Sequence, residues 1–226
     1  MQPRRMVSPL NRRLMGLFDE TLAVRRLRQS VGKSTYCQRC GQDVVKNKIL
    51  ANSSKSPAQI RQRKRWPEYS GIADGCWDAL KIGFPKRPRR QSSFNAFVQA
   101  NKDAVTVSEE GMVVVNHEAV LCANGKLKTP QVTATMMKEG RMLTLAHTEG
   151  SYYGHRSEKT DRVYAQAVEK SRQEGLLLEL GSRGEEMTME VALPEDWNLD
   201  EVIVYAFAVA ADKHEASKSR YIVPKG

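Results

Sequence analysis

The sequence has few of the features that mark a membrane protein or a disulfide-rich secreted protein. No apolar run in its 226 residues approaches the roughly 20 residues that cross a bilayer. The N-terminal segment is rich in Arg and lacks the continuous apolar stretch of a secretory signal peptide. Four cysteines are too few to staple a chain of this length with disulfides. We therefore expect a protein that makes no use of a membrane and stays in the cytoplasm.

Catalytic signatures are also scarce. The four histidines lie in separate segments without the spacing of metal ligands. The sequence contains no nucleophile-elbow motif and no helical His-Glu pair. Adjacent carboxylates occur only in turn-like sequence, where solvated charge explains them: Glu109-Glu110, Glu185-Glu186 and Glu195-Asp196. These absences predict a protein that is not an enzyme.

Acidic residues are scarce in the first part of the chain, and this bias is the most informative one. Residues 1–100 contain 21 Lys and Arg against 6 Asp and Glu, a net charge of +15. Residues 101–226 contain 15 against 20, a net charge of −5. So sharp a division predicts two regions with different surroundings. The basic region suits nucleic acid, an acidic protein surface or plain water.

Two interpretations of the arginine-rich start remain open. Leu14, Phe18 and Leu22 recur at every fourth position, which permits a short amphipathic helix over residues 11–28. The alternative is a partly disordered basic arm over residues 1–30. Both interpretations leave many arginines in solvent.

A hairpin and two helices are expected next, in a small α+β unit over residues 31–107. Residues 34–49 have β-branched residues on both sides of a turn at Gly41-Gln42-Asp43, which predicts a β-hairpin. Ser56, Pro57 and Gln59 form the start signal of a helix. Its apolar face continues through Tyr69, Ile72, Ala73, Cys76, Trp77 and Leu80. Ser93 is the expected cap of a second helix, with a face formed by Phe94, Phe97, Val98, Asn101, Ala104 and Val105.

After Gly111 the apolar pattern changes to short runs of alternating residues separated by turn signals. The expected strands cover 112–115, 119–122, 131–137, 142–147, 163–169, 176–180, 187–193, 201–210 and 219–223. Short antiparallel strands at this spacing predict a β-sandwich over residues 112–226. The final two strands resemble the closing hairpin of a fibronectin or immunoglobulin-like module.

Several short motifs carry a resemblance to a known family. Lys55-Ser56-Pro57-Ala58-Gln59 with Gln62-Arg63 is the most specific, and Lys81–Phe84, Phe94–Ala96 and Val202–Val223 follow it. These motifs resemble a large uncharacterised Bacteroidota family, known only as a domain of unknown function. The resemblance covers most of residues 31–226 and implies no catalytic residue and no cofactor. The chain departs from that family at its N-terminus, where arginines and cysteines replace a Gly-rich segment and a Ser-Trp-Lys-Gly element.

Cys37-Gln-Arg-Cys40 is the best candidate metal element. Two thiolates at this spacing, followed by Gly, form half of a zinc site. A complete site needs two further ligands, and the sequence has no second pair. Cys76 and Cys122 lie in apolar settings, where free cysteine behaves as a small hydrophobic residue. We expect no cofactor, with zinc at Cys37 and Cys40 as the alternative.

Two basic clusters border the expected helices and are the candidate nucleic-acid contacts. Phosphate contacts need grouped cations of this kind. The clusters are Arg61, Arg63, Lys64, Arg65 and Lys86, Arg87, Arg89, Arg90. The alternative interpretation is a helix that simply faces water.

The sequence thus predicts an α+β protein that binds or assembles rather than catalyses. The first hypothesis is a structural or assembly component of a phage or mobile element, working through a protein partner or self-assembly in the cytoplasm or a virion. Similar helices in uncharacterised proteins of such elements suggest it by analogy. The second is a protein that binds DNA or RNA through its basic half without reading the base sequence. The oligomeric state is left open.

Overall fold

The chain forms two units, residues 1–55 and residues 56–226. The computed structural model describes residues 15–17, 29–39, 42–48, 55–148 and 156–226. The sequence suggested a different division, with residues 31–107 together and 112–226 apart. The helices after Ser56 instead share a core with the later strands, which places them in the second unit. No helix of the described segments is long and apolar enough to cross a membrane.

The first unit contains a four-stranded antiparallel sheet in the order β1-β4-β3-β2. Its strands are β1 (Met15–Leu17), β2 (Gln29–Val31), β3 (Ser34–Arg39) and β4 (Gln42–Asn47). The predicted hairpin is confirmed, since β3 and β4 pair from Ser34 opposite Asn47 to Arg39 opposite Gln42. A helix through residues 15–17 is wrong, because β4 offers that backbone an antiparallel partner. The remainder of the expected arm, apart from β2, lies outside the described residues.

Three helices open the second unit: α1 (Pro57–Gly75), α2 (Trp77–Gly83) and α3 (Ser93–Ala100). The predicted start of α1 is confirmed. The Gln59 amide donates to Ser56 Oγ, and the Ser56 amide donates to Gln59 Oε1, each at 3.4 Å. This reciprocal pair satisfies two amides that a helix start leaves without partners. The cap of α3 is Ser92, one residue before the predicted position.

The single apolar face expected from Tyr69 to Leu80 is divided between two helices. The backbone leaves helical geometry at Cys76 (φ −111°, ψ 12°), which ends α1 and starts α2. Tyr69, Cys76 and Leu80 are buried as expected, but Trp77 is 49% exposed. The break therefore places the Trp77 ring outside the core.

The strands of the second unit form three antiparallel sheets, in the orders β10-β9-β12-β13, β11-β8-β7 and β5-β6. Their bounds are β5 Val105–Val107, β6 Val113–Val115, β7 Val132–Met137, β8 Met142–His147, β9 Arg162–Glu169, β10 Glu174–Ser182, β11 Met187–Ala192, β12 Val202–Val209 and β13 Arg220–Ile222. The mixed α+β class is confirmed, and the strands predicted after residue 130 all occur. Val105, expected on a helix, lies in β5.

The strand expected over residues 119–122 is wrong. A short 3-10 helix, η1 (His117–Ala119), begins this segment. The side chain of Asn101 then bonds both backbone groups of Leu121: Nδ2 donates to the carbonyl, and Oδ1 accepts from the amide at 2.7 Å. The Cys122 amide donates to Ser219 Oγ at 3.0 Å. Side chains therefore replace the strand partner that the sequence pattern suggested.

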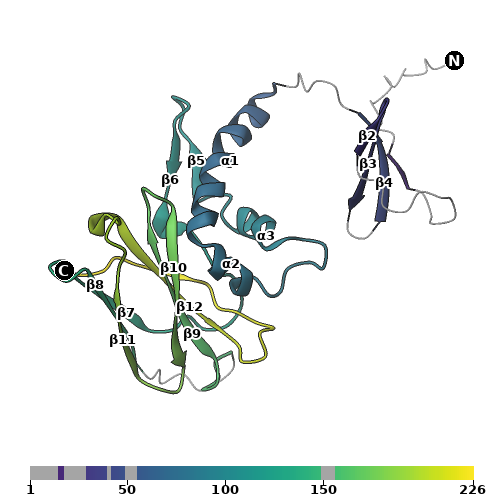
Figure 1. Ribbon diagram of the computed structural model, residues 1–226. Coiled ribbons are helices and arrows are strands. Elements are labelled where there is room, and N and C mark those ends of the chain that lie inside the picture. The colour runs from purple at the N-terminus through teal and green to yellow at the C-terminus, as the bar shows by residue number, and fades with distance from the viewer. Residues whose placement is uncertain (1–14, 18–28, 40–41, 49–54, 149–155) are drawn as a thin grey trace, which may run out of the picture. The chain divides into compact units, whose positions relative to one another are not determined.

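Strand β12 is the centre of the second unit, because it is buried along its whole length. Val202, Val204 and Ala206 belong to a core shared with the three-stranded sheet. The alternate residues Ile203 and Tyr205 belong to a second core, shared with the helices. The helices thus cover one face of the four-stranded sheet, and β11-β8-β7 covers the other (Figure 1). A strand covered on both faces has no polar side, which explains its continuous apolar sequence.

Candidate functional site

The first turns of α1 carry one of the two predicted basic clusters. Every residue from Lys55 to Lys64 is exposed, so this part of the helix has no buried face. The segment from Lys55 to Arg65 contains no acidic residue. A helix start whose only charged side chains are basic is suited to contact phosphates. The cations of this cluster are Arg61, Arg63, Lys64 and Arg65, of which the first three are exposed.

Two of these four cations are also used inside the fold. Lys64 Nζ donates to the Gly111 carbonyl at 2.8 Å. The Arg65 guanidinium donates to the Tyr69 hydroxyl and the Lys102 carbonyl, and its Cζ lies 5.4 Å from the centre of the Tyr69 ring. Arg65 and Lys64 therefore attach α1 to later segments of the chain. The other two cations of this cluster, Arg61 and Arg63, are exposed.

The second cluster lies on the connector between α2 and α3, and it too has structural contacts. Arg87 donates to the carbonyls of Phe84 at 2.8 Å and Gln91 at 3.1 Å, closing the connector on itself. Lys86 forms an ion pair with Glu215. Burial raises the pKa of Glu215, but hydrogen bonds from Lys86 and from backbone amides together lower it by more. The pKa of Glu215 is therefore below its usual value. This carboxylate therefore stays ionised and holds Lys86.

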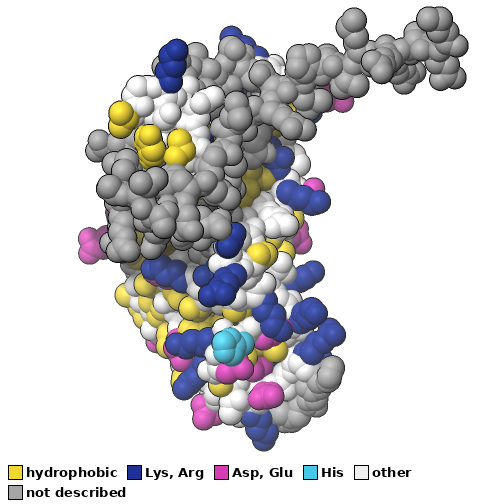
Figure 2. All heavy atoms as spheres, turned by 90° about the vertical axis from the view of Figure 1, so that its right-hand side faces the viewer, with side chains coloured by type: hydrophobic (Ala, Val, Ile, Leu, Met, Phe, Trp, Pro, Cys, Tyr) yellow, Lys and Arg dark blue, Asp and Glu magenta, His cyan; other side chains and the backbone are white. Residues whose placement is uncertain are grey.

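The connector cations also line a hollow of about 340 Å³ beside α3. Amide side chains complete its wall, and Gln91 Nε2 donates to Gln99 Oε1 at 2.9 Å. Lys86 and Arg87 are the predicted residues that the fold brings together here. Arg89 and Arg90 are exposed and do not line the hollow. Figure 2 shows that Lys and Arg side chains spread over the described part of one face, with acidic side chains between several of them.

The first unit contributes exposed cations that the sequence interpretation did not single out. Lys33 lies in the turn between β2 and β3, and the Lys48 amide donates to its carbonyl at 2.7 Å. The hairpin thus brings Lys33 and Lys48 to the same end of the sheet, while Lys46 is exposed on β4. The only sequence signal for these residues is the overall charge of the segment.

The three cysteines that the structure describes lie in different settings. Cys37 is a half-buried free thiol on β3. Cys40 lies outside the described residues, so zinc binding by Cys37 and Cys40 stays a prediction. Cys76 and Cys122 are buried, and a hydrogen bond between the two side chains, followed by burial, raises the pKa of Cys76. Nowhere in the described ranges do three or more His, Cys, Asp or Glu residues form a group that could hold a metal ion.

A further hollow that involves charged side chains lies elsewhere, at one end of the second unit's sheets. We call it the end cavity; it has a volume of about 780 Å³. Its wall includes Lys159, Arg162, Tyr164, Glu179, Ser182 and Lys213. These residues come from three distant segments, so no local motif in the sequence could identify them.

One family model matches the chain, that of a family of unknown function (DUF6266), over residues 28–223. No curated protein and no solved structure matches it significantly. The family match includes the hairpin of the first unit, all three helices and every strand of the second unit. The expectation of a domain of unknown function is therefore confirmed at this level. The chain belongs to the family of unknown function DUF6266.

Proposed function

We propose that this protein binds nucleic acid without reading its base sequence, and that it is not an enzyme. The observation that carries the proposal is the distribution of charge between the two units. Residues 1–55 contain 12 Lys and Arg against 3 Asp and Glu, whereas residues 56–226 contain 24 against 23. The second unit is therefore nearly neutral, and the excess positive charge belongs to a unit of 55 residues. Such a concentration of cations favours a polyanion.

The proposed contact residues are the exposed cations of the first unit and of the first turns of α1. In the described part of the chain these include Lys33, Lys46, Lys48, Arg61 and Arg63. The earlier candidates Lys64, Arg65, Lys86 and Arg87 hold the fold together, so their loss would disturb structure as well as binding. Arg89 and Arg90 stay candidates for additional phosphate contacts.

Salt dependence tests this proposal directly. Binding of the full chain to a fluorescent 30-mer of single-stranded DNA, duplex DNA or RNA is measured by anisotropy across a salt series. Each phosphate contact contributes a slope of about −0.7 to −0.9 in log affinity against log salt. Replacing Lys33, Lys46, Lys48, Arg61 and Arg63 with Ala should weaken binding more than 10-fold at low salt and flatten the slope by about 3.5 to 4.5.

A matched variant controls for net charge alone. Lys126, Lys138, Lys218, Arg220 and Lys225 are exposed cations of the second unit. Replacing these five with Ala removes the same charge and should change affinity only about 2-fold by general electrostatics. The proposal is contradicted by absence of binding at low salt, or by equal losses in the two variants.

A role in assembly is the second candidate, and the strand order of the second unit favours it. Taken in chain order, β7, β8 and β11 form one sheet, and β9, β10, β12 and β13 form the other. We infer a fibronectin or immunoglobulin-like sandwich. In that fold the first, second and fifth strands (A, B and E) form one sheet, and the third, sixth and seventh (C, F and G) form the other. In this chain those strands are β7, β8 and β11, then β9, β12 and β13, and the fourth strand, β10, pairs with β9. Modules of this kind are common scaffolds for protein contacts.

In this second proposal the protein is a component of a phage or mobile element, in the cytoplasm or a virion, and its family is the Bacteroidota family that the sequence resembles. Light scattering behind size exclusion measures its assembly over a concentration series, and co-purification from its native cells measures partners. A monomer at high concentration that recovers no partner contradicts the assembly role. It leaves the nucleic-acid proposal standing, because the anisotropy assay needs no partner protein.

A further inference from the structure

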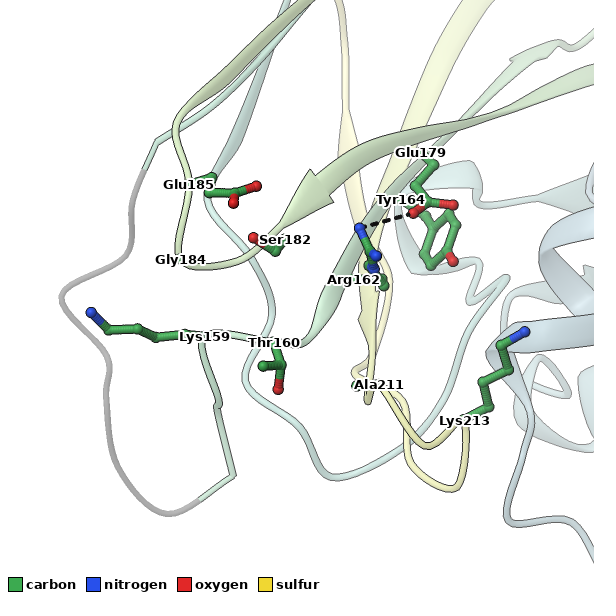
Figure 3. A pocket seen from close by; sticks show the side chains of 10 residues that line it. All are labelled: Lys159, Thr160, Arg162, Tyr164, Glu179, Ser182, Gly184, Glu185, Ala211 and Lys213. Atoms are coloured by element: carbon green, nitrogen blue, oxygen red, sulfur yellow. Dashed lines mark ion pairs between the residues drawn. The ribbon is translucent and has the colours of Figure 1, made fainter.

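The end cavity lies where β9 begins and where β10 and β12 end (Figure 3). Lys159 comes from the turn before β9, Arg162 from the start of β9, Glu179 and Ser182 from the end of β10, and Lys213 from the turn after β12. Figure 3 shows Lys159 and Lys213 at opposite sides of the hollow, with Arg162 between them. The cavity is open to solvent and large enough for a ligand of several rings.

A buried ion pair holds the wall of the end cavity in place. Arg183 Nε donates to Asp161 Oδ2 at 3.1 Å, and both side chains are only 3% exposed. The Arg183 amide also donates to the Asp161 carbonyl at 2.7 Å, and the Gly184 amide donates to the Lys159 carbonyl at 3.0 Å. These bonds attach the segment before β9 to the turn after β10. The lining side chains therefore stand on a fixed backbone, as a binding site requires.

The lining combines charges of both signs with hydroxyl groups. Arg162 Nη1 lies 3.5 Å from Glu179 Oε1, so the central cation already has a partner. Burial, followed by the charge of Glu179 and a hydrogen bond to it, raises the pKa of Tyr164, whose hydroxyl thus stays protonated. Thr160 and Ser182 add two further hydroxyls. Donors and acceptors are therefore interspersed around the cavity.

An aromatic ring forms part of the same wall. Tyr164 is stacked on Phe207, with ring centroids 5.6 Å apart and an interplanar angle of 23°. Because Phe207 is fully buried, it holds the Tyr164 ring in one orientation. A ring fixed in this way offers an apolar surface inside a polar cavity.

We propose that the end cavity binds a neutral saccharide of a few sugar units. Each sugar hydroxyl can accept from an ammonium or guanidinium group and donate to a carboxylate, which fits the mixture of Lys159, Arg162 and Glu179. The carbon face of a sugar ring fits the apolar surface of Tyr164. A small anion suits the cavity less well, because Glu179 and Glu185 offset two of the three cations that line it. This proposal does not depend on nucleic-acid binding.

The test uses the full chain and four neutral tetrasaccharides: cellotetraose, maltotetraose, mannotetraose and chitotetraose. Amide chemical shifts and calorimetry measure binding. At least one sugar should bind with a Kd of roughly 1 mM or tighter, with shifts in residues 159–164, 179–185 and 211–213. Tripolyphosphate, measured in parallel, should bind more weakly than that sugar.

Three variants locate the binding. Tyr164→Leu removes the ring and the hydroxyl and should weaken binding about 10-fold or more. Lys213→Ala alters an exposed residue of the wall and should weaken it several-fold without disturbing the fold. Lys138→Ala removes an exposed cation outside the wall and should leave the Kd unchanged.

Three results overturn the proposal. In the first, none of the four sugars produces saturable shifts. In the second, tripolyphosphate binds more tightly than every sugar. In the third, Lys213→Ala and a folded Tyr164→Leu both keep the original Kd.

Discussion

Glycine decides how closely α1 approaches the sheet. Gln166 Nε2 donates to the Gly75 carbonyl at 2.9 Å, and Gly175 of β10 lies directly against that carbonyl. A Cβ atom at Gly175 would lie 1.8 Å from the Gly75 oxygen. Glycine within a helix costs about 1 kcal/mol relative to Ala. At Gly75 that cost is offset by the close packing of α1 on β10.

Gly175→Ala should therefore destabilise the second unit by about 2–3 kcal/mol, because backbone must move to admit the methyl group. Urea unfolding followed by circular dichroism measures the change. Gly140→Ala is the control, since its Cβ would meet only Met142 Cγ at 3.4 Å. Equal stability of the two variants would contradict a tight contact between Gly175 and the Gly75 carbonyl.

Buried histidine makes stability depend on pH. His147 is 2% exposed, and neither ring nitrogen has a hydrogen-bond partner among the described residues. Burial, followed by the charge of Arg183, lowers the pKa of His147 below 6.5. Burial likewise lowers the pKa of His117. The folded state thus favours the neutral rings.

The unfolding free energy should fall as pH drops through about 6.5, because the two histidines then bind protons in the unfolded chain but stay neutral in the folded chain. Each histidine contributes at most about 1.4 kcal/mol per pH unit, and only until the pH falls below its folded pKa. His147→Leu should flatten this dependence between pH 5 and 7 in urea titrations. His214→Ala, at an exposed position, should leave it unchanged. An equal slope in wild type and His147→Leu contradicts the assignment.

At the scale of elements, α1 has two halves with different roles. Its C-terminal half supplies Tyr69, Ile72 and Ala73 to the core, while its first turns are exposed. Short helices without a packed face are marginal in water. The capping box at Ser56 and the continuous connection to the packed half therefore hold the exposed turns in helical form.

Ser56→Ala should fray the start of α1 at a local cost of about 1 kcal/mol, without lowering global stability. Hydrogen exchange at residues 59 and 60 should accelerate about 5-fold, while the Tm stays within error. Ser92→Ala gives the contrast, because Ser92 caps α3 and Phe97 of that helix is fully buried. It should lower the global unfolding free energy by about 1 kcal/mol. Equal effects of the two substitutions on Tm would show that the first turns of α1 are packed after all.

At the scale of the whole molecule, charge and packing follow the same boundary. The nearly neutral second unit contains both large hydrophobic cores, and the first unit has most of the excess cations. A unit with its own core should fold alone. Residues 1–55 can then be removed to separate binding from folding.

The fragment 56–226 should unfold cooperatively with a Tm within about 5 °C of the full chain, and should lose most affinity for nucleic acid. Differential scanning calorimetry and the anisotropy series measure the two properties. A folded fragment that keeps full affinity would move the binding surface to the second unit. A fragment that fails to fold would show that the two units depend on each other.

Much of the fold was predictable because its signals are local. The capping box at Ser56 and the strands after residue 130 depend on neighbouring residues. The loss of a strand near Leu121 depends on Asn101, 20 residues earlier in the chain. At the end of α1, the Gly75 carbonyl accepts from Gln166, which is 91 residues away. The sequence could not show the structural roles of Arg65 and Lys64 for the same reason, because their side chains bond to carbonyls 37 and 47 residues away.

The sequence by itself determined the charge partition, the helix start and the alternation of the later strands, since composition, caps and periodicity act within a few residues. Only the tertiary structure decided which arginines anchor the fold, why β12 is apolar on both faces, and that Arg162, Glu179 and Lys213 line one cavity. Those outcomes depend on contacts between segments far apart in the chain, which local preferences do not specify.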